Sequence, residues 1–221
     1  MKVLGLIPAR GGSVRVPRKN MELLGGMPLV ELALLCGIGT IGIDNCAVST
    51  DDQIIADHVQ KRFFDLSEYL IRRPADLAAS DTPMLPVVRH AVDHLSTVHR
   101  QSFDVVVLLQ PTSPFRTSAD VEACLAMLQD TGGDAVVSVV DGGDDVAYQV
   151  RHAKRLEKIP HVVVPNGAVY VLRTEALMRG EDWFSGDCYA YKMPKDRSID
   201  IDTPTDLELA RFMVKNGKAS L

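Results

Sequence analysis

The segment from Ile7 to Asn20 combines a glycine turn with clustered positive charge. It reads IPARGGSVRVPRKN and contains four cations but no acid, in a chain whose formal net charge is -5. Glycines let the backbone turn tightly and aim its amide groups at a ligand, and several cations around one space suit a triphosphate. The alternative is a basic surface loop that contacts an acidic neighbour. The cations are Arg10, Arg15, Arg18 and Lys19, and the turn is formed by Gly11, Gly12 and Ser13.

A pair of carboxylates near the other end of the chain could bind a metal ion. In the sequence SIDIDTP, an extended backbone would place Asp200 and Asp202 on one face and Ile199 with Ile201 on the other. Neighbouring carboxylates repel each other unless a cation lies between them, and Mg²⁺ binds one or two carboxylates together with substrate phosphates. The alternative is a solvent-exposed strand end that caps the following helix. Taken together, the two segments predict a site for a metal-bound nucleotide.

Neither of two common phosphate-binding motifs follows the first apolar run. No GxxxxGK[ST] occurs, which excludes a P-loop. No GxGxxG follows the first apolar run, so the dinucleotide-binding fingerprint is also missing.

The composition bounds the class of protein. A chain of 221 residues with 46% hydrophobic and 24% charged residues is typical of a globular protein, and we expect one domain over residues 1–221. The mildly acidic balance argues against nucleic-acid binding, which needs a broad basic surface. No apolar run approaches the roughly 18 residues of a membrane span, and none resembles a signal peptide. We therefore expect a cytoplasmic protein without a membrane partner.

Apolar runs rich in valine and leucine alternate with amphipathic stretches. Continuous apolar runs are typical of strands covered on both faces, so the alternation predicts an α/β three-layer fold with a mostly parallel sheet. Ligands of such sheets bind beyond the carboxyl ends of the strands, where the cationic segment begins. We expect strands within 2–9, 46–50, 104–111, 134–140, 161–172 and 187–194, and helices within 82–95, 117–130, about 174–178 and from the N-cap Thr203 onward.

Six motifs in order resemble the CMP-sialic acid synthetase family, which are cytidylyltransferases for acylneuraminate and related nonulosonic acids, with Kdo-activating enzymes as relatives. The motifs are IPARGGSVRVPRKN, VSTDD, AASDT, LLQPTSPFR, PNGAVYV and SIDIDTPTDLELA. The resemblance implies a Rossmann-like nucleotidyltransferase that uses CTP and Mg²⁺ and forms a homodimer. It would transfer CMP to a small acidic acceptor, a sialic-acid-like (nonulosonic) sugar acid, and release pyrophosphate. The resemblance also implies that residues about 141–190 form an acceptor-binding and dimerisation excursion.

The resemblance assigns roles to individual residues by their position in these motifs. Nucleotide binding is assigned to Arg10, Gly11, Gly12, Ser13, Arg15, Lys19, Asn20, Arg73, Ser80 and Asp81. Catalysis is assigned to Lys19, Arg10 and Asp202, and the Mg²⁺ ligands are Asp200 and Asp202. Acceptor binding is assigned to Gln110, Asn166 and Tyr170, together with Trp183 and Phe184, which would reach into a partner subunit's site.

Three departures from the family pattern leave the acceptor open. The usual lysine after the loop serine is Val14 here, although Arg15 remains. An arginine before PNGAVY is replaced by Leu156, unless Arg155 takes its place by a one-residue shift, and the stretch between Val140 and Pro165 is shorter than in sialic acid enzymes. One alternative is therefore CMP transfer to a small phosphonate such as phosphonoformate in antibiotic biosynthesis. A more remote one is a nucleotide-binding protein without catalysis.

Overall fold

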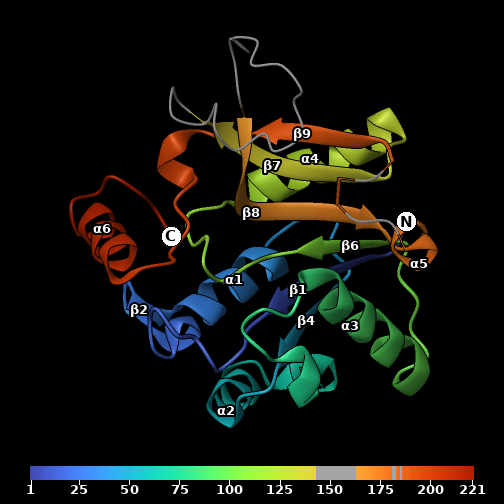
Figure 1. Ribbon diagram of the computed structural model, residues 1–221, viewed down its shortest axis with the longest axis horizontal. Coiled ribbons are helices and arrows are strands. Elements are labelled where there is room, and N and C mark those ends of the chain that lie inside the picture. Colours follow the sequence, from blue (N-terminus) through green and yellow to red (C-terminus); the bar gives the residue numbers. More distant parts are fainter. Residues whose placement is uncertain (143–162, 181–182, 185) are drawn as a thin grey trace.

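The computed structural model describes residues 1–142, 163–180, 183–184 and 186–221. Within them, one seven-stranded sheet runs through the centre of the molecule (Figure 1). The strands follow the order β5 (Leu70–Arg72), β4 (Asn45–Thr50), β1 (Val3–Pro8), β6 (Val105–Leu108), β8 (Val163–Arg173), β7 (Ala135–Asp141) and β9 (Cys188–Lys192). Only β8 is antiparallel to its neighbours in this sheet, because every other adjacent pair is parallel.

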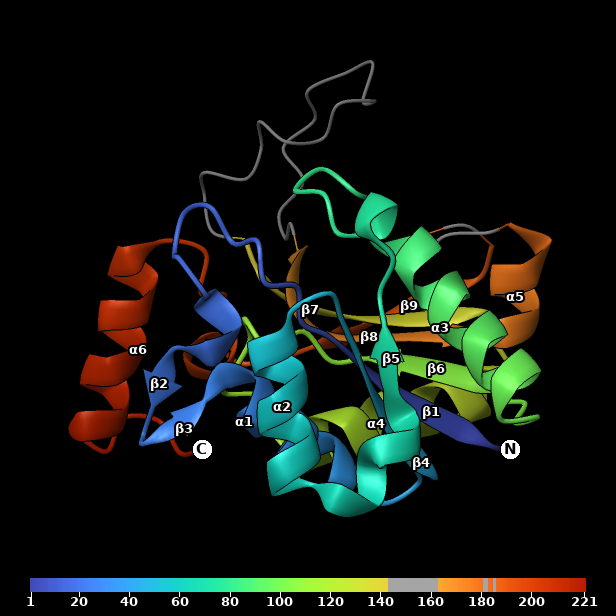
Figure 2. The ribbon, with the colours of Figure 1, turned by 90° about the horizontal axis from the view of Figure 1, so that it is seen from below.

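Helices cover both faces of this sheet and complete a three-layer arrangement (Figures 1 and 2). One face packs against α1 (Leu29–Ile38), α2 (Gln53–Arg62) and α4 (Ser118–Thr131). The other packs against α3 (Met84–Val98) and α5 (Thr174–Arg179). The predicted α/β three-layer fold with a mostly parallel sheet is confirmed.

The side chains of β6 show why the strands read as continuous apolar runs. Val105 and Val107 point into the cluster under α1 and α4, whereas Val106 and Leu108 point into the cluster under α3 and α5. Successive strand residues face opposite sides, so a strand covered on both sides needs an apolar residue at every position.

A third apolar cluster ties the two predicted binding segments together. It forms where α6 (Pro204–Lys215) packs beside the hairpin of β2 (Leu23–Leu24) and β3 (Met27–Pro28), as Figure 2 shows. Val16 of the cationic segment and Ile201 of the acidic segment are both buried in it. Burial of these two residues in one core fixes the distance between the two segments.

One expectation about the second half of the chain needs correction, and the acceptor-binding and dimerisation role of residues about 141–190 stays a prediction. Residues 198–202 are not a strand, although Ile201 is buried and Asp200 with Asp202 face the opposite side, as the alternation predicted. The part of the expected excursion that the structure describes beyond residue 162 belongs to the main layers, because β8 lies between β6 and β7 in the sheet. Leu156, Arg155 and the rest of 143–162 lie outside the described residues.

Two helices begin where the sequence predicts. Thr117 and Thr203 begin α4 and α6, each with a capping box closed by an aspartate three residues later. None of the helices in the described residues is long and apolar enough to span a membrane.

Candidate active site

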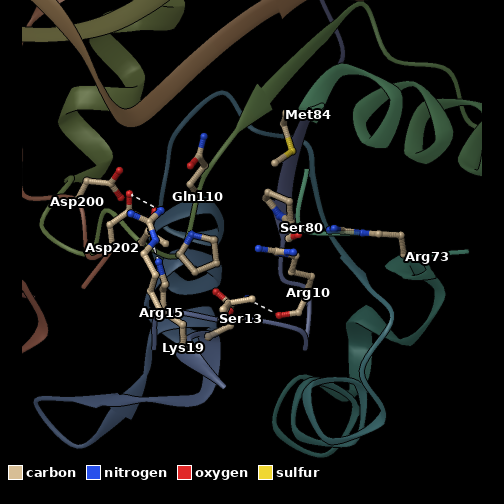
Figure 3. A pocket seen from close by; sticks show the side chains of 15 residues that line it. Arg10, Ser13, Arg15, Lys19, Arg73, Ser80, Met84, Gln110, Asp200 and Asp202 are labelled. Atoms are coloured by element: carbon tan, nitrogen blue, oxygen red, sulfur yellow. Dashed lines mark hydrogen bonds and ion pairs between the residues drawn. The ribbon is translucent and has the colours of Figure 1, made fainter. Parts of the chain in front are cut away.

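A cleft of about 570 Å³ opens at the carboxyl edge of the sheet, where the cationic and acidic segments face each other (Figure 3). Asp200 and Asp202 lie at one end of it, Arg73 lies at the other, and Arg10 lies between them. The segments are far apart in the sequence but share this one cavity. Its lining consists of Pro8, Arg10, Ser13, Val14, Arg15, Lys19, Asn20, Arg73, Ser80, Met84, Gln110, Pro111, Thr112, Asp200 and Asp202.

Asp202 is held by two cations of the N-terminal segment. Lys19 Nζ lies 2.9 Å from Asp202 Oδ1, and Arg15 Nη2 lies 3.1 Å from Asp202 Oδ2. Lys19 is only 8% exposed, so its charge is largely withdrawn from water. Buried ammonium groups require a partner, and Asp202 provides one.

Asp200 experiences a different environment in the same cleft. Desolvation raises the pKa of its carboxyl group, and the charge of Asp202 adds to this shift, while a hydrogen bond with Thr112 and the charge of Lys19 oppose it. The two carboxylates are therefore close enough to repel each other, which a cation between them would relieve.

The donor set at this end of the cleft fits Mg²⁺. Both side chains offer hard carboxylate oxygens, which Mg²⁺ prefers, and Mg²⁺ normally completes its shell with phosphates and water. No cluster of three or more histidine, cysteine, aspartate or glutamate side chains among the described residues could bind a metal by itself. A metal held at Asp200 and Asp202 would therefore complete its shell with water or with phosphate oxygens.

Hydrogen bonds from several elements fix the backbone that carries the carboxylates. Ile201 N donates to the carbonyl oxygen of Thr112 at 2.7 Å. Arg197, three residues before Asp200, donates two hydrogen bonds to Asp120 at 3.0 and 2.8 Å. Desolvation alone would raise the pKa of Asp120, but the hydrogen bonds from Arg197 and Thr117 outweigh it and hold the pKa low. The carboxylate segment is thus positioned before any ligand binds.

The opposite end of the cleft is built around a buried arginine. Arg73 donates to the hydroxyl and the carbonyl oxygen of Ser49 at 3.2 and 2.8 Å. Burial lowers the pKa of Arg73, an effect that the Asp51 charge opposes and the Arg10 charge reinforces. Arg10 and Arg73 are therefore neighbouring cations on the floor of the cleft, which favours an anionic or electron-rich ligand.

The turn glycines differ from their predicted role. Gly11 N donates to Asp51 Oδ1 at 3.0 Å, so this amide points to the protein rather than to a ligand. A Cβ at Gly11 would lie 2.3 Å from the carboxylate oxygen of Asp52, which explains why glycine is required there. Gly12 has open space around it. Neither glycine lines the cleft, whereas Ser13 does.

The predicted acceptor residues are only partly brought together. Gln110 lines the cleft, and Tyr170 lies beside it: burial raises the pKa of Tyr170 and the Asp200 charge adds to the shift. Asn166 is instead 5% exposed and bonded to Ser138 and Ser198, which corrects its assignment to the acceptor. It joins β7, β8 and the segment leading to Asp200.

The aromatic pair near residue 183 divides into a core residue and a surface residue. Trp183 is 7% exposed and its ring centroid lies 5.4 Å from that of Tyr170, so it packs inside its own chain. This corrects the expectation that Trp183 reaches a partner subunit. Phe184 is 60% exposed, and its role at a partner's site stays a prediction.

Thr112 and Met84 line the cleft although they were not predicted to belong to the site, whereas Asp81 was predicted and does not line it. Thr112 follows Gln110 by two residues within LLQPTSPFR, so its place after β6 could have indicated it. Met84 lies within the predicted helix 82–95, and as the first residue of α3 it lines the cleft. Arg116, the last residue of LLQPTSPFR, does not line the cleft. It is buried and donates to the carbonyl oxygen of Gln110 at 2.7 Å, so it supports a residue that does.

A cleft at the carboxyl edge of an α/β sheet, with clustered cations facing paired carboxylates, defines the class of nucleotidyltransferases. The chain belongs to the cytidylyltransferase family, whose sequence profile matches residues 4–211. This confirms the resemblance derived from the six motifs.

Relatives of known name share this sequence over most of its length. The CMP-N,N'-diacetyllegionaminic acid synthase of Legionella pneumophila is 28% identical over 242 residues, covering 100% of both chains. The pseudaminic acid cytidylyltransferase of Campylobacter jejuni is 24% identical, covering 97% of each. The N-acylneuraminate cytidylyltransferase of Streptococcus agalactiae is 28% identical over 93% of this chain, which spans only 52% of that longer protein.

Solved structures share the fold. A CMP:2-keto-3-deoxy-manno-octonic acid synthetase complexed with CTP superposes with a TM-score of 0.74 at 17% identity, covering 98% of this chain and 100% of the other. The 4-diphosphocytidyl-2C-methyl-D-erythritol synthase of Anaerococcus prevotii gives a TM-score of 0.62 at 14% identity, covering 97% and 96%. Both support the same nucleotidyltransferase architecture.

Proposed function

We propose that this chain transfers CMP from CTP to a nonulosonic sugar acid and releases pyrophosphate, with Mg²⁺ held at Asp200 and Asp202. The observation that carries the proposal is the 2.9 Å contact between Lys19 and Asp202, because it joins the cationic and acidic segments in one cleft. The cleft supplies cations for a triphosphate and carboxylates for a metal within reach of each other.

In the proposed reaction the protein forms no covalent bond with either substrate. A hydroxyl oxygen of the acceptor forms a bond to the α-phosphorus of CTP, the bond from that phosphorus to the β-phosphate oxygen breaks, and the hydroxyl proton leaves to water. Phosphoryl transfer of this kind depends on positioning and charge neutralisation. Mg²⁺, when bound, would neutralise phosphate oxygens beside Asp200 and Asp202. Arg10 and Lys19 would stabilise the charge that develops on the departing pyrophosphate.

The acceptor is inferred from the named relatives. Those from Legionella, Campylobacter and Streptococcus carry names that refer to legionaminic, pseudaminic and N-acylneuraminic acid, which are nine-carbon sugar acids. They favour a nonulosonic acid over a small phosphonate. The residues that prompted the phosphonate alternative, Leu156 and its neighbours, lie outside the described part of the chain.

A panel of acceptors tests this proposal. Wild-type protein with CTP and Mg²⁺ is incubated with N-acylneuraminate, diacetyllegionaminate, pseudaminate, Kdo or phosphonoformate, and pyrophosphate release is measured against a reaction without acceptor. We expect one of the three nonulosonic acids to exceed phosphonoformate by about 10²-fold, since a polar site discriminates strongly against a ligand that leaves its groups unpaired. Release with phosphonoformate alone would reverse the acceptor assignment. Binding of CTP without turnover on any acceptor would favour the non-catalytic alternative.

We also propose a homodimer, on the strength of the family resemblance and the exposed ring of Phe184. Sedimentation velocity at several protein concentrations should give the mass of two chains, and Phe184→Ala should weaken the association. A monomer at every concentration would contradict the dimer without affecting the acceptor assignment. A cytoplasmic location belongs to the same proposal.

A further inference from the structure

Both carboxylate oxygens of Asp202 have a cationic partner within the chain. Lys19 takes Oδ1 and Arg15 takes Oδ2. Under the proposed function the same two cations bind the triphosphate, and the same carboxylate binds the metal. One set of side chains therefore has two sets of partners.

The charges at this end of the cleft balance without a ligand. Lys19 and Arg15 carry two positive charges, and Asp200 and Asp202 carry two negative charges when ionised. A divalent metal that binds without nucleotide would have to displace Lys19 and Arg15 from Asp202, its proposed ligand. A triphosphate arriving alone would meet cations already neutralised by Asp202. Metal or triphosphate alone must therefore break the ion pairs of Asp202 with Lys19 and Arg15. When both bind, the metal replaces the cations at Asp202, and the phosphates replace Asp202 at the cations.

The exchange needs only side-chain rotation. Val16, between the two cations, is buried in the third apolar cluster, and Lys19 N donates to the carbonyl oxygen of Val16 at 3.1 Å. The backbone of the segment is thereby anchored. The side chain of Arg15 is 64% exposed and free of the core, so it can turn from Asp202 towards the cleft.

We propose that Lys19 and Arg15 exchange partners during binding: they pair with Asp202 in the nucleotide-free chain and with the phosphates when nucleotide binds, which releases Asp202 to the metal. This inference rests on the proposed function and deepens it. Its consequence is positive coupling, because each ligand performs the ion-pair breaking that the other requires. Such coupling is reciprocal by thermodynamic necessity.

The first test measures metal binding without nucleotide. Mn²⁺ alone is titrated into wild type and Arg15→Gln, and the free ion is measured by electron paramagnetic resonance. Arg15→Gln should bind Mn²⁺ about fivefold more tightly, as expected for release of an exposed ion pair. Arg18→Gln is the matched control, because Arg18 lies in the same segment and carries the same charge but does not line the cleft. It should remain within about twofold of wild type. Equal affinity of the Arg15 and Arg18 variants would overturn the exchange.

The second test measures nucleotide binding without metal. CTP is titrated in the presence of EDTA into Asp202→Asn and Asp200→Asn, each of which removes one carboxylate from the same cleft. Asp202→Asn also frees two cations, whereas Asp200 forms no ion pair with the described residues. Asp202→Asn should therefore bind metal-free CTP at least about fivefold more tightly than Asp200→Asn. Equal affinities would mean that only general repulsion was removed, which contradicts the exchange.

Failure of this inference is distinguishable from failure of the proposed function. Wild type that binds Mn²⁺ in the presence of CTP, with no gain in the Arg15 variant, rejects the exchange and leaves the cytidylyltransferase site intact. Wild type that binds no Mn²⁺ even with CTP rejects the metal assignment and the exchange together. Thermal midpoints of all variants, measured in the same buffers, separate binding changes from unfolding.

Discussion

Asp202→Asn is expected to reduce kcat/KM for CTP about 10³-fold or more while leaving the fold intact. Asparagine has the same shape but no charge, so it weakens the metal site and leaves Lys19 without its carboxylate. Loss of a single preorganised electrostatic group typically costs 10²–10³-fold in rate, and a metal ligand should lie at the upper end or beyond. The fold should survive because the side chain of Asp202 is 43% exposed and α6 is capped by Thr203 and Asp206.

The measurement is pyrophosphate release as a function of CTP concentration at several Mg²⁺ concentrations. Asp196→Asn serves as control, because Asp196 is an exposed carboxylate in the turn just before the acidic segment. That variant should retain activity within about twofold. If Asp202→Asn retained comparable activity at ordinary Mg²⁺, Asp202 would not be a ligand. Tight binding of metal-free CTP combined with lost turnover would show that the cleft is intact in the variant.

Six of the seven strands of the sheet and helices α3 to α6 were accessible to sequence reasoning because local chemistry determines them, whereas β5, α1 and α2 were not predicted. Continuous valine runs require cover on both faces, and Thr203, Pro204 and Asp206 encode a helix start by capping alone. The antiparallel direction of β8 could not be derived in this way, since Val163–Arg173 has the same apolar composition in either direction. Strand direction depends on the connection from β7, and that connection includes residues without local signals.

The candidate site could be predicted from the sequence only where its residues have charged side chains. A cation cluster and a carboxylate pair are recognisable from residue type and spacing, so Lys19, Asp200 and Asp202 were predicted to share a site, and all three line one cleft. Their roles in binding and catalysis stay predictions. Residues that act through packing were not distinguishable. Asn166 was predicted to bind the acceptor, but it is buried and accepts a hydrogen bond from Ser138. The sequence does not distinguish an asparagine that faces a ligand from one that faces the core.

Burial decided the other misassignments. Trp183 was expected at a partner's site from its position in the family pattern, yet it packs under α3 and α5 in the core cluster. Gly11 lies in a turn that could cradle phosphate, but its amide is bonded to Asp51. Both outcomes depend on elements distant in the sequence, and neither leaves a local pattern that predicts it.

Lys19→Ala is the second substitution with a large expected effect. We expect kcat/KM to fall about 10²–10³-fold, because the proposed mechanism uses this ammonium group to stabilise charge on the departing pyrophosphate. Lys19 is nearly buried, so water cannot replace its charge at the same position. Inhibition by added pyrophosphate should weaken in parallel, since the product and the transition state share this contact. Pyrophosphate release and product inhibition, measured on one preparation, provide both readouts.

The neighbouring arginine supplies the control for Lys19. Arg18→Ala removes the adjacent charge, but Arg18 is exposed and lies outside the cleft, so its activity and pyrophosphate inhibition should stay within about twofold of wild type. A purely structural role for Lys19 would lower the thermal midpoint and the activity together. Its removal leaves Asp202 43% exposed and still paired with Arg15, so the carboxylate remains solvated and the fold should persist. Wild-type kinetics in Lys19→Ala would therefore identify this lysine as a counterion of Asp202 alone, with no part in phosphate chemistry.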